Sequence, residues 1–542
     1  MHTSPSGRDT NGSPAGSEPD TAGVQASAPV APTAVEPTVP AAGPTTAASD
    51  DGIDLRQRSV SSGLYMIARE GIGLTLRFGG LLVLTRLLGP DKYGVYAGAA
   101  ALIVIPTFVA QLATETYLVR MPTEPPKRVY DEAFTVVLIS SIVVVGAVLG
   151  LTYAVPAILA DDRMMDAFRI LLISVPINAL WAPAQAKLER QYEYRSVALL
   201  ELSGDVILYA GAIGGVVAGL GYWGPVMAMI TWQSWLLLGS MVVARYRPTL
   251  RLSKAGARDQ VSYGLRYTAS VSIQIVRGAL NPLFVGHFVG TAGVGAVALA
   301  TQITEALSAF TRVVWRTGAV TIGRLQNDAR RLAHAVREYV VVLVLVMGSA
   351  MAMFIIFSPW LVTAVFGDRW EPVVPLLPYL CAASLIWVEG TVGTIVLTTR
   401  LKMASVAVSQ AVRLLLMAAA APLLLHFAGL TGFGIAECVS AASTLVLARA
   451  LRRELPGFGV LFLVPLYAAV MPPLFWNEVE PAVARPLLFL PAAATLTVPA
   501  FRARLAGYAR LPMEAVSRRR RHAGTDTQPD GHDLSATAEA TS

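Results

Sequence analysis

The stretch Gly89-Pro-Asp-Lys-Tyr-Gly-Val-Tyr-Ala97 separates two long apolar runs of this 542-residue chain. A similar stretch, Gly290-Thr-Ala-Gly-Val-Gly-Ala-Val-Ala298, lies 201 residues later, again between two apolar runs. A second pair of turns, Gly219-Leu-Gly-Tyr-Trp-Gly224 and Gly429-Leu-Thr-Gly-Phe-Gly434, is separated by 210 residues. Glycines at these positions indicate tight turns. Two matches in the same order, at nearly the same offset, predict that the chain contains two copies of one unit.

The apolar runs around these turns have the length of membrane-spanning helices. Hydrophobic residues make up 54% of the chain and charged residues only 15%, with a mean hydropathy of +0.55. A helix of about 20 apolar residues crosses a hydrocarbon layer of about 30 Å. The sequence therefore predicts an all-α polytopic membrane protein with about fourteen spans, at 63–87, 94–118, 130–155, 168–188, 197–219, 224–244, 264–289, 292–320, 338–357, 373–399, 404–427, 431–449, 458–476 and 485–504.

The loops between the predicted spans alternate in charge. One set of loops carries 30 basic residues, whereas the other set carries only Lys92, Arg163, Arg369 and Arg485. Lysine and arginine are retained on the cytoplasmic side of membrane proteins, so the first set is predicted to be cytoplasmic. We therefore expect a multi-pass protein of the cell membrane with both termini in the cytoplasm. The opposite loops are short, which disfavours a membrane glycosyltransferase or polymerase that works through a large outer loop.

The predicted spans and tails divide the chain into five segments. Residues 1–58 and 512–542 are polar, low-complexity tails that are expected to be disordered, the second one basic. Two six-helix bundles are predicted at 59–247 and 258–453, followed by two extra, proline-rich spans at 458–511. Six is an even number, so the two bundles share one orientation and are related by an axis along the membrane normal. Parallel repeats of this kind are a transporter architecture that suits alternating access.

Three stretches carry a resemblance to a known family. They are Thr85-Arg-Leu-Leu-Gly-Pro-Asp-Lys-Tyr-Gly-Val-Tyr-Ala97, Ala186-Lys-Leu-Glu-Arg-Gln-Tyr-Glu-Tyr-Arg195 and Gly221-Tyr-Trp-Gly224. Over roughly residues 60–455 the chain resembles the Wzx-type polysaccharide transporters, the lipid-linked oligosaccharide flippases of the multidrug/oligosaccharidyl-lipid/polysaccharide exporter superfamily. The two extra spans are similar to those of the peptidoglycan-precursor flippases of that superfamily, although no motif here singles out that branch.

The resemblance implies a fold and a function. The fold would be two six-helix bundles that face each other as a V. The function would be export of polyprenyl-pyrophosphate-linked oligosaccharide units for polysaccharide biosynthesis, which makes the chain a transporter and not an enzyme. Its partners would be the lipid-linked oligosaccharide, membrane lipids, and a polysaccharide polymerase and glycosyltransferases.

Charged residues inside the apolar spans are the candidate substrate-binding residues, because such charges usually face a cavity or a partner. A pyrophosphate needs several positive donors, and arginine offers a planar fork that matches phosphate oxygens. Arginines on spans 1, 7 and 8 are hypothesised to hold the pyrophosphate, with Asn281 on the Arg277 face and two glutamates that balance the charge. The candidate set is Arg77, Arg277, Asn281, Arg312, Arg316, Glu115 and Glu305. The alternative is that these residues form structural salt bridges or reach the membrane surface from span ends.

Three other acids inside the predicted spans, Glu389, Asp205 and Glu201, are candidates for coupling transport to an H⁺ or Na⁺ gradient, with a purely structural role as the alternative. The scattered histidines and the two cysteines predict no metal site, and no phosphate-binding loop or other cofactor motif is present. Because the basic residues lie in short loops, the pI near 9.4 indicates topology and not nucleic-acid binding. The leading alternative functions are an ion-coupled drug or metabolite antiporter of the same fold and a membrane glycosyltransferase or polymerase. A non-transporting scaffold would not need charges buried on matching faces.

Overall fold

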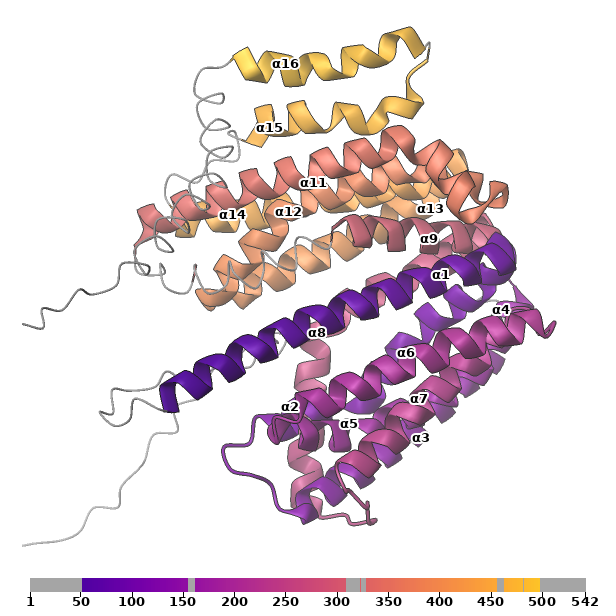
Figure 1. The fold of residues 1–542 in the computed structure, drawn as a ribbon, viewed down its shortest axis with the longest axis vertical. Coiled ribbons are helices and arrows are strands. Elements are labelled where there is room, and N and C mark those ends of the chain that lie inside the picture. The colour runs from indigo at the N-terminus through magenta and orange to yellow at the C-terminus, as the bar shows by residue number, and fades with distance from the viewer. Residues whose placement is uncertain are drawn as a thin grey trace, which may run out of the picture.

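The computed structural model describes residues 51–154, 161–308, 322, 328–455, 463–480 and 482–497. These residues form α-helices and short 3₁₀ helices, and the described part of the chain contains no strand. The predicted all-α fold is therefore confirmed. Figure 1 shows α3, α6 and α7 on one side of the molecule and α11, α12 and α13 on the other, with α1 between them.

The described residues of the first half form seven α-helices. They are α1 (Asp51–Gln111), α2 (Thr114–Val119), α3 (Lys127–Ala154), α4 (Asp162–Leu171), α5 (Ser174–Arg190), α6 (Tyr194–Val217) and α7 (Trp223–Val243). The long α1 contains the first predicted span and most of the second, which ends in α2, because the helix turns at Gly89, whose φ is 70°. A φ in the left-handed region favours glycine, as the sequence pattern indicated.

The second half repeats this arrangement. It contains α8 (Lys254–Phe288), α9 (Thr291–Leu307), α11 (Ala329–Phe366), the 3₁₀ segment η2 (Asp368–Leu376), α12 (Leu377–Thr399), α13 (Met403–Ala441) and α14 (Thr444–Glu454). The turn at Gly429, with a φ of 55°, divides α13 as Gly89 divides α1. The four glycine turns at Gly89, Gly219, Gly290 and Gly429 all have positive φ. We call the end of the helix bundle where they lie the glycine-turn end.

A helical hairpin follows the second half. It consists of α15 (Leu463–Val470), η4 (Pro472–Glu478), η5 (Ala482–Phe489) and α16 (Leu490–Thr497), and it lies beside α11 (Figure 1). Asn477 Nδ2 donates a hydrogen bond to the Ile355 carbonyl at 2.6 Å, and the Tyr467 hydroxyl donates to the Leu385 carbonyl at 3.1 Å. The hairpin is thus joined to α11 and α12 by hydrogen bonds as well as by apolar packing.

Eight helical ranges of the described residues are long and apolar enough to cross a membrane. Two of them, Gly71–Val119 and Met403–Glu454, contain two predicted spans each, and the other six contain one each, so ten of the fourteen predicted spans are represented. Predicted span 7 is helical as α8, and α9 begins predicted span 8. The protein is a multi-pass membrane protein. Large apolar side chains are exposed on the outside of the bundle, for example Phe427, Val217 and Val242, as expected for a surface that faces lipid chains.

The loop motif 186–195 has a structural role in this fold. Arg190 Nη1 donates hydrogen bonds to the carbonyls of Leu118, Val119 and Met121, and Nη2 donates to the carbonyl of Thr123, at 2.8 to 3.1 Å. These carbonyls lie at the end of α2, where no further helical turn follows to satisfy them. The arginine of the motif therefore holds the end of α2 against α5.

Candidate functional site

Arg77 and Arg277 occupy positions in the two copies of the repeat that differ by one residue. Arg77 lies 12 residues before Gly89 on α1, and Arg277 lies 13 residues before Gly290 on α8. With a rise of 1.5 Å per residue, the two positions are about 18 and 20 Å from the glycine-turn end, near the middle of a hydrocarbon layer of about 30 Å. One arginine from each half therefore lies at nearly the same distance from the glycine-turn end.

Arg77 forms an ion pair with α6. Its Nε donates to Asp205 Oδ2 at 2.7 Å, and the arginine side chain is 49% exposed whereas that of Asp205 is 8% exposed. One turn along α1, Gly80 lies directly against the Tyr209 ring, and a Cβ added at Gly80 would overlap that ring. The missing side chain at Gly80 is what lets α1 approach α6 closely enough for this ion pair.

Arg277 belongs to a larger cluster in the second half. Its Nη1 donates to Glu437 Oε1 at 2.9 Å, and Arg413 Nη2 lies 3.7 Å from Glu437 Oε2. The Arg413 guanidinium stacks over the Trp387 ring, 4.0 Å from its centroid, and the Ser440 hydroxyl donates to Glu437 Oε2 at 3.4 Å. The Arg277 side chain is 31% exposed, whereas those of Glu437 and Arg413 are 8% and 11% exposed. One carboxylate thus bridges an accessible arginine and a buried one.

These contacts explain how charged groups persist inside an apolar bundle. A buried carboxylate without a cation costs several kcal/mol, so Asp205 and Glu437 need their arginines. Arg77 and Arg277 remain partly exposed, so their guanidinium groups can be reached by a ligand that brings its own negative charge. The three arginines and two carboxylates of this set carry a net charge of +1. The set is suited to an anion.

The other predicted substrate residues lie in different surroundings. Asn281 lies one turn after Arg277 on α8, and its Oδ1 is buried without a hydrogen-bond partner. Glu305 is an exposed residue near the end of α9. Glu115, in the first turn of α2, interacts with Glu189 of α5 and Glu201 of α6. Arg312 and Arg316 lie outside the described residues.

The three predicted coupling acids are separated in the structure. Asp205 forms the ion pair with Arg77 described above. Glu201 belongs to the acidic group with Glu115 and Glu189. Glu389, on α12, faces Arg452 of α14 and Tyr467 of α15, and its Oε1 is buried without a hydrogen-bond partner. No group of three or more metal-ligating side chains with a suitable arrangement occurs among the described residues.

The two halves touch at the glycine-turn end, and the contact is reciprocal. A Cβ added at Gly94 would overlap the Thr291 carbonyl, and a Cβ added at Gly295 would overlap the Pro90 carbonyl. Gly94 and Gly295 are equivalent residues of the two copies, and equivalent residues touch each other only near the axis that relates them. The glycines of the repeated motif are therefore needed for close approach of the two halves.

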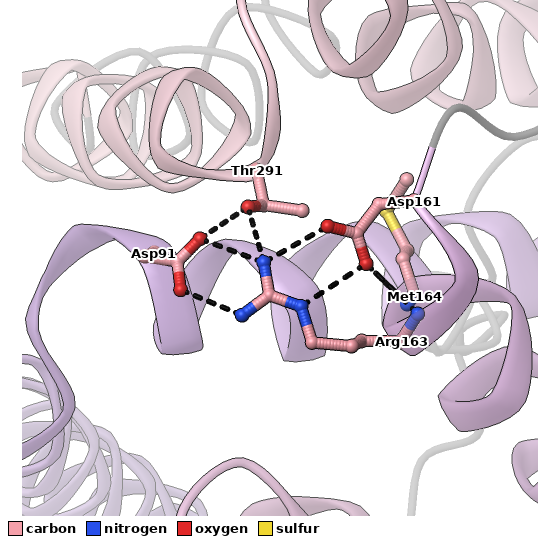
Figure 2. A network of polar contacts seen from close by, with 5 residues as sticks. All are labelled: Asp91, Asp161, Arg163, Met164 and Thr291. Atoms are coloured by element: carbon pink, nitrogen blue, oxygen red, sulfur yellow. Dashed lines mark hydrogen bonds and ion pairs between the residues drawn. The ribbon is translucent and has the colours of Figure 1, made fainter.

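A hydrogen-bond network centred on Arg163 lies next to this contact, and Figure 2 shows its members. Arg163 Nη1 and Nη2 donate to the Asp91 carboxylate at 2.9 and 3.1 Å, and Nη2 also donates to Asp161 Oδ2 at 2.9 Å. Thr291, from the other half, donates its hydroxyl to Asp91 and accepts from Arg163 Nη2 at 3.3 Å. The hydrogen bonds from Arg163 hold the pKa of Asp91, which lies in the turn between two spans, below its usual range. The network joins three turns from both halves of the chain.

Replacing Arg163 with alanine is expected to loosen this contact. The Asp91 carboxylate loses its cation, and the first half keeps only the Thr291 hydroxyl as a polar link in this network. A cysteine placed at Val294, a buried residue of α9 beside Gly98 of the first half, should therefore react with a membrane-impermeant maleimide several-fold faster in the R163A background of an otherwise cysteine-free chain. The matched control is Arg169→Ala, because Arg169 pairs with Asp166 and stacks on Tyr153 within the first half. Equal labelling rates in the two backgrounds would contradict a role for Arg163 in the contact.

Sequence reasoning missed several of these groups. Arg413 and Glu437 are visible as charges within apolar runs, but the pairing of Glu437 with Arg277 crosses 160 residues of sequence. Arg163 was counted only as a residue of a loop with few basic residues, and its contact with Asp91 crosses 72 residues. The sequence signal for Arg413 and Glu437 is a charged residue within an apolar run.

The chain is similar to proteins of known families. The family model described as "Polysaccharide biosynthesis protein" matches residues 83–375, which is more than half of the chain. The lipopolysaccharide biosynthesis protein WzxC of Escherichia coli (strain K12) is 19% identical over 341 residues, which cover 62% of this chain and 68% of that protein.

Two solved structures share the architecture. The lipid II flippase MurJ in an inward closed conformation is 11% identical, with a TM-score of 0.57 over 81% of this chain and 98% of that one. A multidrug resistance transporter of the MATE family, which belongs to the MOP superfamily, is 15% identical in its inward-facing conformation, with a TM-score of 0.55 over 72% of this chain and 98% of that one. At these identities the likeness shows the fold alone. It confirms the predicted superfamily fold.

Proposed function

Because the chain belongs to the polysaccharide biosynthesis protein family, we propose that it is a flippase that carries polyprenyl-diphosphate-linked oligosaccharide units across the cell membrane. The observation that carries the proposal is the pair of arginines, Arg77 and Arg277, one in each half and at nearly the same distance from the glycine-turn end. Both are partly exposed and both rest on a buried carboxylate. A diphosphate that enters between the halves would meet an arginine from each side.

The chemistry of the arginine set favours an anionic group over a cationic one. A guanidinium presents two parallel N–H donors that match the oxygens of a phosphate, and such charge-assisted hydrogen bonds are about twice as strong as neutral ones. The net charge of +1 attracts the diphosphate, which has two negative charges in a diester, into an interior that otherwise excludes it. Asn281, with its buried and unpartnered oxygen one turn from Arg277, would face a sugar hydroxyl that donates a hydrogen bond.

Transport by this site requires the glycine-turn end to open and close. The alternation of loop charge supports an orientation with the glycine-turn end outside the cell and both termini in the cytoplasm. In the conformation described here, Gly94 and Gly295 bring the two halves together at that end. The substrate would enter from the cytoplasmic side, where glycosyltransferases would supply it. It would leave when the Gly94–Gly295 contact separates, for use by a polysaccharide polymerase outside.

A multidrug exporter is the second candidate, because the MATE transporter shares the fold. The arginine set discriminates between the two functions. A site for cationic drugs would have an excess of acidic or apolar groups, whereas the Arg77, Arg277 and Arg413 set has an excess of positive charge. Expressing the chain in a drug-sensitive host should therefore leave the resistance to cationic drugs unchanged.

The experiment that tests the proposed function is depletion of the protein in its own host. We expect lipid-linked oligosaccharide to accumulate on the cytoplasmic face of the membrane, where externally added glycan-cleaving enzymes cannot reach it in intact cells. Re-expression of the wild-type chain should restore access, and re-expression of the variant with both Arg77→Ala and Arg277→Ala should not. Normal appearance of the glycan outside depleted cells would contradict the proposal.

A further inference from the structure

We propose that Asp205 and Glu437 are exchangeable counter-ions of Arg77 and Arg277, and that a bound diphosphate group draws Arg77 away from Asp205, which then takes up a proton from water. The inference rests on the proposed function, because it assigns a step to the same substrate site. It also distinguishes the two halves, since Glu437 keeps a cation in the bound state and Asp205 does not.

Asp205 depends on a single cation. Its side chain is 8% exposed, and Arg77 of α1 is the cation that the described part of the chain places within ion-pair distance of it. The other ionisable groups near it are Tyr209, one turn later on α6, and Glu201, one turn earlier. The neighbouring helix α7 contains no ionisable side chain between Trp223 and Val243, and α5 contributes Glu189, which interacts with Glu115. The two basic residues of α5, Lys187 and Arg190, donate to backbone carbonyls of other segments. Among the described residues, no second positive group is therefore in place to hold Asp205 as an anion.

Glu437 is held from two sides. Arg277 of α8 contacts its Oε1, and Arg413 of α13 contacts its Oε2. Arg413 is fixed in place, because its side chain is 11% exposed and its guanidinium is stacked on Trp387 of α12. Cys438 lies beside Glu437 in sequence, and Ser440 donates a hydroxyl hydrogen bond to the carboxylate. When Arg277 turns to a ligand, Arg413 and Ser440 remain with Glu437.

The consequence follows from the cost of a buried charge. An isolated carboxylate in an apolar interior binds a proton instead of remaining ionised. When the diphosphate takes the N–H donors of Arg77, Asp205 accepts a proton on a carboxylate oxygen from water that enters from the cytoplasmic side. No other bond is made or broken in this step. When the ligand leaves, Arg77 returns to Asp205 and the proton returns to water.

This exchange links ligand binding to pH. Because the bound state holds one more proton than the empty state, affinity rises by up to about tenfold for each unit fall in pH over the range in which Asp205 changes state. The ligand must contribute no proton of its own. A polyprenyl-diphosphate joined to a sugar meets this condition, because both of its phosphates are diester-like and stay ionised at neutral pH.

The test is calorimetric titration of the full chain, in lipid nanodiscs, with undecaprenyl-diphospho-N-acetylglucosamine as the probe. The titration is repeated near neutral pH in buffers of different ionisation enthalpy, and the slope of the heat against that enthalpy gives the number of protons taken up. We expect the wild type to take up about one proton per bound probe. Asp205→Asn should bind the probe with no uptake and with no dependence on pH, whereas the matched variant Glu437→Gln should retain the uptake.

Each other outcome overturns a stated part of the account. Binding by the wild type without proton uptake overturns the counter-ion exchange and leaves the proposed function intact. Uptake that persists in D205N, or that disappears in E437Q, overturns the assignment to Asp205. Absence of binding by the wild type overturns the proposed function and this inference with it. The wild-type slope needs no variant, so the test holds even if D205N does not fold.

Discussion

A chain with both Arg77→Ala and Arg277→Ala is expected to lose transport of the lipid-linked oligosaccharide almost completely. A hydrogen bond to a charged group contributes about 1.5 to 3 kcal/mol, so each single variant should lower transport by at least about tenfold and the double variant by at least about a hundredfold. The loss should be specific to the diphosphate. The measurement is the rate at which a fluorescent polyprenyl-diphosphate-linked sugar crosses the membrane of reconstituted vesicles.

A matched control separates loss of binding from loss of fold. Arg120 donates a hydrogen bond to the Tyr263 hydroxyl at 3.0 Å, at the end of the bundle opposite the glycine turns, and Arg120→Ala removes a positive charge without touching the arginine set. It should transport close to the wild-type rate. If the double arginine variant elutes as a folded protein and transports like R120A, then the two arginines do not hold the substrate.

The second large effect is expected at the contact between the halves. Replacing Gly94 with leucine should lower transport by about tenfold or more, because a side chain there cannot coexist with the Thr291 carbonyl and the Gly295 amide of the other half. The two halves would no longer close at the glycine-turn end. The transport cycle would therefore stop in the conformation in which this end is open. Transport in the same vesicles is one measurement, and maleimide labelling of a cysteine at Val294 is the second.

Gly146 supplies the control for this variant. It lies within α3, and a Cβ added there has no neighbouring atom within 4 Å, so Gly146→Leu adds the same side chain in open space. We expect G146L to transport close to the wild-type rate and to leave the labelling of Val294→Cys unchanged. If G94L transports as well as G146L, the Gly94–Gly295 contact is not part of the transport cycle.

The architecture was largely predictable from the sequence because its signals are local. Apolar runs separated by glycine turns identify spans without knowledge of how they pack, and the offset of 201 residues between the turns at Gly89 and Gly290 reveals the repeat. The eight apolar ranges agree with ten of the predicted spans. The helix α8, which contains predicted span 7, is not among these ranges, because Arg277 and its other polar residues lower its mean hydropathy.

The pairing of charges was not predictable from the sequence. Arg77 and Arg277 were identified because a charge in an apolar span needs a reason, yet the acids expected to balance them were Glu115 and Glu305. In the structure Arg77 pairs with Asp205 and Arg277 pairs with Glu437. The partners are 128 and 160 residues apart in the sequence. Such pairs depend on which helix faces pack, and a local feature such as Gly80 against Tyr209 decides this. No pattern within one helix contains that information.

The fold does not identify the substrate, so the substrate class must be inferred from the charged residues of the site. The MATE structure and MurJ share the architecture, so the fold does not choose between a cationic drug and an anionic lipid-linked sugar. In the proposed function, that choice depends on the excess positive charge of the arginine set. The chemistry of the two partly exposed arginines, Arg77 and Arg277, is therefore the feature that most needs a direct test.

The most direct test is flipping by the purified protein alone. The chain is reconstituted in vesicles with a fluorescent undecaprenyl-diphospho-N-acetylglucosamine in both leaflets, and the fraction that dithionite quenches is followed. The account predicts that wild-type vesicles lose nearly all fluorescence, whereas vesicles with the double Arg77→Ala, Arg277→Ala variant lose only about half, as protein-free vesicles do. Loss of only about half of the fluorescence with correctly folded wild-type protein would contradict the claim that this chain moves a diphosphate-linked sugar across the membrane.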